Sequence, residues 1–159
     1  MTPAVAADPA VTQDVVEGSM LNRMILAVLA LIGVLISAYM TAYKFGLLGE
    51  IVCGTGGCST VQNSPWASFM GVPVPLIGLL GYGALMATAL AGVEAFRTSR
   101  LVPLTLVAGA SVGLLFSAYL TYLEAFVIHA WCRWCITSAV LSVLVFLFTL
   151  PEFRRLRSN

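Results

Sequence analysis

The chain has 159 residues, of which 60% are hydrophobic and only 9% are charged. A soluble domain of this length must leave part of its surface to water, so this much apolar side chain excludes an ordinary soluble fold. The net charge of +1 comes from few, scattered basic residues, which offer no footprint for a phosphate backbone. We therefore expect membrane lipid, and no nucleic acid, as a partner.

Four apolar runs are long enough to cross a membrane, because a spanning helix needs about 20 mainly apolar residues. They extend from about Met24 to Tyr43, from Pro73 to Gly92, from Val102 to Phe126 and from Cys132 to Leu150. The first run starts too far into the chain, and is too long, for a cleaved signal peptide. The predicted fold class is an all-α integral membrane protein, a four-transmembrane-helix bundle that forms one domain over residues 22–152.

The two ends of the chain are predicted to be tails. Residues 1–21 are rich in alanine, valine and proline without periodicity, which predicts a disordered segment. Residues 153–159 form a short basic tail. Pro151 is expected to end the fourth helix, because proline lacks the backbone N–H of a helix interior. Close contacts between helices are expected at small residues such as Gly33 and Ser37.

The basic residues predict the orientation, since Lys and Arg gather on the cytoplasmic side of a membrane. Six of the eight lie on one side of the predicted spans: Arg23, Arg97, Arg100, Arg154, Arg155 and Arg157. Both termini are therefore predicted to be cytoplasmic, and all four cysteines to lie at the outer face. That face is oxidising in bacteria, as is the lumen of the endoplasmic reticulum in eukaryotes.

The loop after the first span holds Cys53 and Cys58, with three glycines among the four residues between them. Such a hinge allows two sulfur atoms to approach. The residues after Cys58 predict a short amphipathic helix on the outer face, which ends before Pro65. Four aromatic residues nearby are typical of an interfacial belt: Trp66, Phe69, Trp131 and Trp134.

A second cysteine pair, Cys132-x-x-Cys135, opens the fourth predicted helix. Residues three apart in a helix face the same way, so this pair forms a disulfide or a dithiol with little movement. Free backbone N–H groups and the helix dipole favour a thiolate at Cys132, and Arg133 adds positive charge. Cys132 is predicted to be the exchange-competent sulfur, and Cys135 to face the bundle. Two pairs at one membrane face predict thiol–disulfide chemistry.

Other interpretations of these residues remain open. Both pairs would be static in a non-catalytic membrane protein with structural disulfides. A four-cysteine zinc site is disfavoured by the loose spacing of the first pair, and we expect no metal. His129 is more typical of a plain hydrogen-bonding residue than of a base. Glu124 is expected to be a hydrated charge at the end of the third helix.

The cysteines belong to a longer pattern with three parts: Cys53-x4-Cys58-Ser59-x-Val61-x2-Ser64-x-Trp66, Gly71-Val72-Pro73 leading to Gly78-x3-Tyr82, and Cys132-x-x-Cys135-x2-Ser138. Over about Arg23 to Leu150 this pattern resembles the vitamin K epoxide reductase family in its bacterial form. The arrangement of the cysteines with Cys-Ser-x-Val-x2-Ser is the specific part of the likeness.

The resemblance implies a four-helix core around a quinone and a relay of thiols. In this relay Cys53 meets an external carrier, Cys58 exchanges with Cys132, and Cys135 faces the quinone. Ser64 matches a family serine near the quinone-side cysteine. The implied activity is quinone-dependent thiol oxidation, which promotes disulfide formation. The implied carrier is a periplasmic thioredoxin-fold (DsbA-like) protein, and the implied acceptor is menaquinone or ubiquinone.

The quinone site is expected to be lined by Val74, Ile77, Leu120 and Trp134. Animal members of the family have polar side chains at positions that correspond here to Val74 and Ala139, which are both apolar. This difference favours plain quinone reduction over the alternative, reduction of vitamin K epoxide. Many bacterial members carry a fused thioredoxin domain, whereas this chain is expected to use a separate partner protein.

Overall fold

The computed structural model describes the backbone of residues 9–54, 57–94 and 99–158, and the side chains between residues 20 and 153 within those ranges. This part of the chain contains the helices α1 (Pro9–Lys44), α2 (Gly57–Asn63), α3 (Val74–Glu94), α4 (Leu101–Leu123) and α5 (Arg133–Ser158). Shorter elements connect them: the 3-10 turn η1 (Pro65–Ala67), the strands β1 (Ser68–Phe69) and β2 (Val72–Pro73), and the π-helical turn η2 (Glu124–Ile128).

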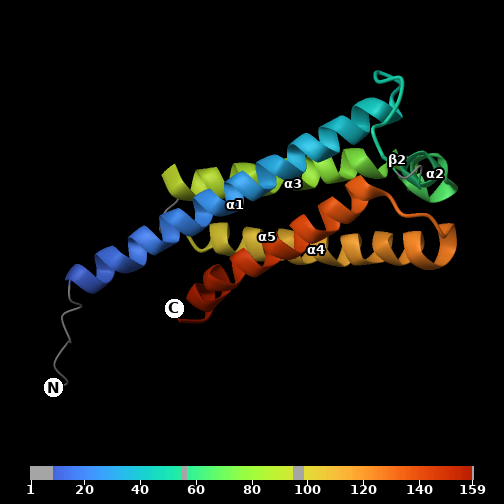
Figure 1. The fold of residues 1–159 in the computed structure, drawn as a ribbon. Helices are drawn as coiled ribbons and strands as arrows, with labels where there is room; N and C mark the ends of the chain where they lie inside the picture. The colour runs from blue at the N-terminus through green and yellow to red at the C-terminus, as the bar shows by residue number, and fades with distance from the viewer. Residues whose placement is uncertain (1–8, 55–56, 95–98, 159) are drawn as a thin grey trace.

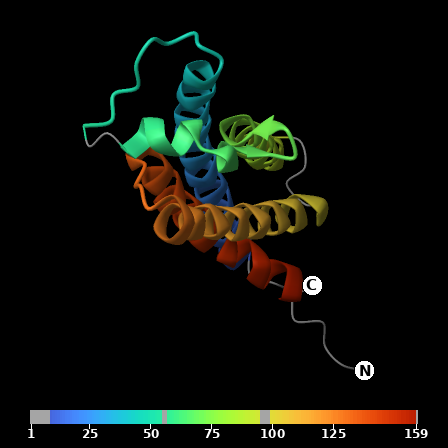
Figure 2. The same cartoon turned by 90° about the vertical axis from the view of Figure 1, so that its right-hand side faces the viewer.

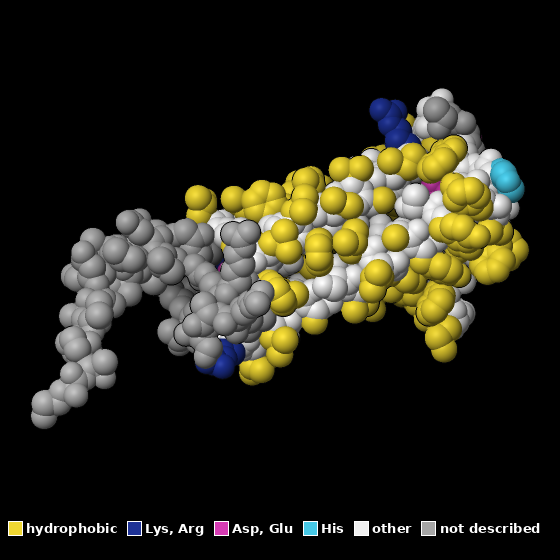
Figure 3. All heavy atoms as spheres, turned by 90° about the horizontal axis from the view of Figure 1, so that it is seen from below, with side chains coloured by type: hydrophobic (Ala, Val, Ile, Leu, Met, Phe, Trp, Pro, Cys, Tyr) yellow, Lys and Arg dark blue, Asp and Glu magenta, His cyan; other side chains and the backbone are white. Residues whose placement is uncertain are grey.

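Four segments of the described chain are long and apolar enough to cross a membrane: Met20–Lys44, Val74–Glu94, Leu101–Ile128 and Arg133–Phe153. Large apolar side chains lie along the length of the face drawn in Figure 3. Each of the four spans carries exposed ones, such as Leu35, Leu80, Leu115 and Val140. So large an apolar surface is suited to lipid rather than to water. The predicted all-α, four-helix membrane bundle is confirmed.

The ends of the bundle differ. α1 begins and α5 ends at one end, whereas α2, the two strands and η2 lie at the other (Figure 1). Figure 2 turns this second end toward the viewer. Within the bundle α1 packs mainly against α3, and α4 mainly against α5. The segment between α1 and α3 and the turn between α4 and α5 therefore lie at the same end of the bundle.

Small residues allow α1 and α3 to approach closely. A Cβ atom added to Gly33 would lie 2.5 Å from the ring of Tyr82, and one added to Gly78 would lie 3.0 Å from the hydroxyl of Ser37. Gly33 and Ser37, four residues apart on one face of α1, therefore both face α3. This is the packing that the sequence predicted for the pair.

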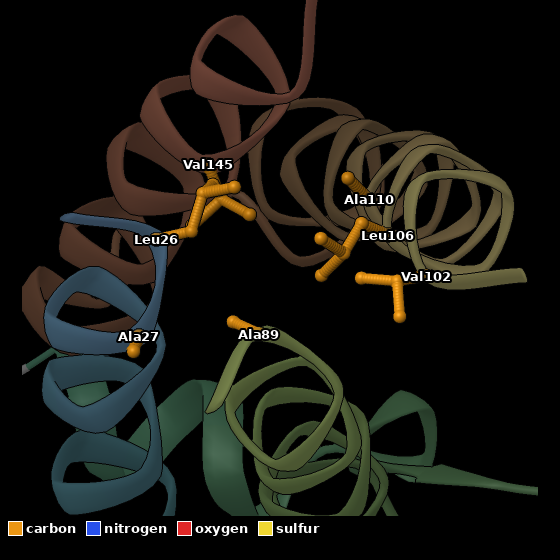
Figure 4. Packing of buried hydrophobic residues seen from close by; sticks show 7 residues of the cluster. All are labelled: Leu26, Ala27, Ala89, Val102, Leu106, Ala110 and Val145. Carbon is orange, nitrogen blue, oxygen red and sulfur yellow. The ribbon is translucent and has the colours of Figure 1, made fainter. Parts of the chain in front are cut away.

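An apolar core closes the bundle at the end where α1 begins (Figure 4). All four long helices contribute to it: Leu26, Ala27, Ala89, Val102, Leu106, Ala110 and Val145. Each of these side chains is buried. Two of these core residues, Ala110 and Val145, also line the cavity described below.

A buried ion pair reinforces the same end. Arg23 of α1 donates from Nε and Nη2 to the two carboxylate oxygens of Glu152 on α5, each at 3.0 Å. Its Nη1 donates to the backbone carbonyl of Gly92 on α3 at 2.7 Å. Both charged side chains are almost fully buried. One guanidinium thus joins three of the four long helices.

The prediction that Pro151 ends the fourth helix is wrong, because α5 continues through it to Ser158. A proline removes one backbone hydrogen bond and crowds the preceding turn, but neighbouring packing can compensate. Here the compensation is immediate, since the residue after Pro151 is Glu152, which binds Arg23. The ion pair holds the turn that follows the proline against α1.

We expect Glu152→Ala to lower the free energy of unfolding by about 3–5 kcal/mol, because it leaves the Arg23 guanidinium buried without its partner. Thermal unfolding in detergent measures the effect as a lower Tm. Glu94→Ala is the control, since Glu94 is an exposed acid at the end of α3. An unchanged Tm in Glu152→Ala would contradict the assignment.

The N-terminal boundary also differs from the prediction. α1 begins at Pro9, so residues 9–21 are helical where a disordered tail was predicted. Extending an established helix costs less than starting one, and the first span supplies that helix. Residues 1–8 and Arg97 lie outside the described residues, as do the side chains of the last three arginines. The cytoplasmic placement of the termini stays a prediction.

The loop between the first two spans is ordered by short elements. α2 ends at Asn63, before Pro65, as the sequence predicted. A hairpin that was not predicted follows, with a turn at Met70 and Gly71, whose φ values of 52° and 82° suit a tight hairpin turn. Its strands are too short to show alternation in the sequence. They pair antiparallel in the register Ser68–Pro73 and Phe69–Val72.

Candidate functional site

All four cysteines lie at the end of the bundle that holds α2 and η2. Cys53 and Cys58 form a disulfide, with their Cα atoms 5.9 Å apart. Cys132 and Cys135 are free thiols. Cys58 and Cys132 are fully buried, and with Cys53 they belong to one packed cluster. An oxidised pair therefore lies beside a reduced pair.

Gly57 permits this closeness. A Cβ atom at this position would overlap the backbone carbonyl oxygen of Trp131. Backbone atoms cannot rotate away as a side chain can, so only glycine fits without a shift of α2 or of the chain before α5. Gly57 directly precedes Cys58, and Trp131 directly precedes Cys132. The close approach of the two backbones thus brings these two cysteines together.

Cys132 is the N-cap residue of α5. Its carbonyl oxygen accepts the first hydrogen bond of the helix, from the N–H of Ile136 at 2.9 Å. The hydrogen bond from the Cys135 thiol lowers the pKa of Cys132 below its usual value and outweighs burial, which acts in the opposite direction. A thiolate is thus favoured, as expected at a helix N-terminus. Because its sulfur is fully buried, Cys132 reacts in this conformation only with groups of its own protein.

Glu124 lies at the centre of the site. Its side chain is 4% exposed, and its Oε2 accepts a hydrogen bond from the backbone N–H of Cys132 at 3.1 Å. The Cys135 thiol is a second donor to this carboxyl, and its single proton is shared between the carboxylate and the Cys132 sulfur. The carboxylate oxygen and the two sulfurs all lie within 4.8 Å of one another. The prediction of a hydrated helix-end charge is wrong, because η2 and the start of α5 cover this residue.

The π turn η2 sets the position of Glu124. It follows α4 directly and ends at His129, whose φ of 55° lies in the left-handed region. Single π turns often occur at functional sites because they shift the side chains of one turn relative to a regular helix. His129 itself is exposed at this end of the molecule (cyan in Figure 3). In the fold, His129 is the residue at which the helical segment of α4 and η2 ends.

Carboxylates and thiolates are also groups that bind metals, and Glu124, Cys132 and Cys135 lie close enough together to share one ion. A metal held by both thiols would prevent them from closing into a disulfide. The Cys53–Cys58 disulfide likewise withdraws two sulfurs from any four-cysteine zinc site. We assign no metal here.

A cavity of about 800 Å³ extends from the cysteines between the helices. Cys135 lines it, and so do all four residues expected from the sequence to hold a quinone: Val74, Ile77, Leu120 and Trp134. Most of the remaining wall is apolar or glycine, and the volume is that of a typical ligand site. The second sulfur of the CxxC pair therefore faces an apolar space large enough for a flat ring and part of a tail.

Two polar groups in the wall test whether a quinone fits. Gln62 of α2 is buried, and its Oε1 has no hydrogen-bond partner among the described residues. That oxygen can accept from a hydroquinone hydroxyl, and the amide turned over would donate to a quinone carbonyl. The hydroxyl of Tyr82 lies 3.0 Å from the carbonyl oxygen of Ser138. An apolar cavity with a few placed polar groups near Cys135 fits a quinone.

Ser64 lies beside the same cysteine. Together with Cys135 and Glu124 it lines a second, small cavity of about 40 Å³. Its hydroxyl donates to the carbonyl oxygen of Val61 at 2.7 Å. Since that bond uses the only hydroxyl proton, Ser64 in this conformation can accept a hydrogen bond in the site but cannot donate one.

The aromatic residues divide into two groups. Trp66, Phe69 and Trp131 are exposed, as an interfacial belt requires. Trp134 is half-buried, and its indole N–H donates to the carbonyl oxygen of Val52 at 3.0 Å. Its ring lies 5.1 Å from that of Tyr39, between centroids. Trp134 therefore fixes the residue before Cys53 to α5 and also forms part of the cavity wall.

The sequence analysis did not predict that Gln62, Tyr82 and Glu124 lie in the site. Only one of the three could have been identified from the sequence. Glu124 is the single acidic residue inside the four predicted apolar runs. An ionisable residue in such a run is costly unless it is paired or functional, and this rule would have found it. Nothing in the local sequence distinguishes Gln62 from an exposed loop glutamine.

A comparison with known families agrees with this geometry. A family model for the vitamin K epoxide reductase family matches residues 24–150. The matched region contains all four cysteines, the cavity-lining residues and nearly the whole of the four spans. Proteins of this family are membrane oxidoreductases that use quinones. The chain belongs to the vitamin K epoxide reductase family.

Proposed function

We propose that the protein is a quinone-dependent thiol oxidase that carries electrons from a periplasmic thioredoxin-fold protein to a membrane quinone. One arrangement supports this most strongly. The Cys53–Cys58 disulfide is packed against a CxxC pair, and Cys135 of that pair lines a large apolar cavity. Electrons would enter at the first pair and leave at the cavity.

The relay consists of thiol–disulfide exchanges, each of which needs a thiolate that attacks a disulfide sulfur. A carrier thiolate attacks Cys53 and frees Cys58 as a thiolate. Cys58 then attacks Cys132 of the oxidised second pair, and Cys135 leaves as a thiolate. When the second carrier thiol releases the carrier, Cys53 attacks Cys58, which restores the first disulfide and frees Cys132.

A bound quinone supplies an acceptor for two electrons and two protons, and the Cys132–Cys135 disulfide forms as they leave. The oxidation states of the two cysteine pairs support this order of exchange steps. With the first pair oxidised and the second reduced, the structure matches the stage after the first disulfide has been restored. Cys53 is only 7% exposed, so a carrier has to displace part of the loop around it.

The proposal places the protein in a bacterial inner membrane, with both termini cytoplasmic and the cysteines at the outer face. Menaquinone or ubiquinone would be the acceptor, and a DsbA-like protein the carrier. Labelling of single cysteines in whole cells by an impermeant maleimide tests the orientation. Labelling of the reduced cysteines only after the cytosol is opened would contradict it.

Cys53→Ala is the direct test of the relay. We expect it to stop oxidation of a reduced thioredoxin-fold carrier, because the carrier then has no disulfide to attack. Quinone reduction by dithiothreitol should persist, because the small dithiol can attack the half-buried Cys135 of the oxidised second pair without Cys53. Carrier thiols and quinone absorbance are measured in parallel. Loss of both activities in Cys53→Ala would contradict the entry of electrons at this residue.

A further inference from the structure

Oxidation of the Cys132–Cys135 pair requires a group that takes up a proton in a buried site. A thiol reacts as its thiolate, so an S–H bond must break before an electron pair becomes available. Cys132 is fully buried, and Cys135 is half-buried and faces an apolar cavity. Bulk water is therefore poorly placed to act as the base.

We infer that Glu124 is a catalytic proton acceptor, which takes the proton of the Cys135 thiol and holds it while the pair is oxidised. The carboxyl is in contact with that thiol, and its other contact, from the N–H of Cys132, fixes its orientation. The close grouping of the carboxylate oxygen and the two sulfurs makes the transfer short. This inference rests on the proposed quinone-linked function and adds a residue to its chemistry.

The step balances in protons and electrons. The S–H bond of Cys135 breaks and an O–H bond forms on Glu124. Two electrons then leave the sulfur pair as the bond between the sulfurs of Cys135 and Cys132 forms. The proton on Glu124, and the proton that Cys132 released when it became a thiolate, accompany the two electrons to the quinone. Glu124 returns to its carboxylate form, ready for the next reduced pair.

The titratable groups around Glu124 are poorly placed to accept the proton of Cys135 in its stead. On α5 the titratable neighbours are the two thiols themselves, and on α2 Cys58 is held in its disulfide. Several other titratable side chains near this end are exposed: Glu50, Tyr122, His129 and Arg133. Three more have hydrogen bonds elsewhere, since Tyr82 bonds Ser138, Tyr39 bonds the N–H of Val52 and Lys44 bonds the carbonyl of Gln62.

Glu124→Gln tests the inference, because its amide oxygen still accepts from the Cys132 N–H but cannot take a proton. The first readout needs no quinone: the rate of alkylation of Cys135 in the reduced protein is followed against pH by mass spectrometry. We expect a nearly flat profile in the wild type and a rise of about tenfold per pH unit below the thiol pKa in the variant. Glu50→Gln, at an exposed acid in the segment between α1 and α2, is the control.

The second readout is quinone reduction driven by dithiothreitol. We expect Glu124→Gln to lower kcat by about 100-fold or more with little change in KM, and Glu124→Asp to recover part of the rate. A wild-type alkylation profile and rate in Glu124→Gln would overturn the inference. If the wild type does not reduce quinone at all while its alkylation profile depends on Glu124, the proposed function fails and the proton acceptor stands.

Discussion

Cys135→Ala abolishes quinone reduction and leaves a disulfide between Cys58 and Cys132: this is the expected result with the largest effect. Cys135 is the sulfur that lines the cavity, so its loss removes the only described exit for electrons from the second pair. Cys132 then has Cys58 as its exchange partner, in the same buried cluster. Quinone absorbance measures the first effect, and non-reducing peptide mapping identifies the link.

Cys135→Ser is the matched comparison, because its hydroxyl still donates a hydrogen bond but carries no redox sulfur. The bond from residue 135 lowers the pKa of Cys132, so its loss in Cys135→Ala raises that pKa toward the ordinary thiol range. The Cys58–Cys132 link should therefore form at a lower pH in Cys135→Ser than in Cys135→Ala. Quinone reduction that persists in both variants would refute the place of Cys135 in the relay.

The fold was largely predictable because lipid imposes simple rules. A spanning helix satisfies its own backbone hydrogen bonds, so four apolar runs predict four helices without knowledge of their packing. The boundaries failed where an interaction distant in sequence decides them. Pro151 lies inside α5 because Glu152 pairs with Arg23, from the other end of the chain. No local pattern around the proline contains that information.

The cysteines of the site could be predicted from the sequence, whereas the burial of its polar side chains could not. The spacing of Cys132 and Cys135, and their place at a helix start, follow from local sequence. Whether Glu124 meets water or a thiol depends on η2, a single π turn that the apolar pattern does not reveal. The buried state of Gln62 depends on how α2 lies over the ends of the spans. Both are consequences of tertiary packing.

Burial of the sulfurs gives the relay its selectivity. Cys58 and Cys132 have no exposed surface, so a foreign thiol cannot react with either of them directly. Each can still reach the other, because α2 meets the chain just before α5, at Gly57 and Trp131. Electrons admitted at Cys53 are thereby confined to one route. The contact at Gly57 should then control the rate of the internal exchange.

Gly57→Ala should slow exchange between Cys58 and Cys132 by about 100-fold, since a displacement on the order of 1 Å can have that effect on a reaction between positioned groups. The added methyl overlaps the carbonyl of Trp131 and forces the two sulfur-bearing backbones apart. Rapid acid quench after addition of reduced carrier, followed by alkylation and mass spectrometry, measures the exchange.

Gly49→Ala is the matched control, because Gly49 lies in the same loop and a Cβ atom there would meet nothing within 4 Å. A second measurement distinguishes an effect of Gly57→Ala on the positions of the two sulfurs from an effect on folding. Oxidation of the pre-reduced Cys132–Cys135 pair by quinone should keep its wild-type rate in Gly57→Ala, because the carboxyl of Glu124 and the cavity do not involve α2's first residue. Equal losses in both steps would mean that Gly57 serves only folding, and no loss in either would mean that the close approach is not used.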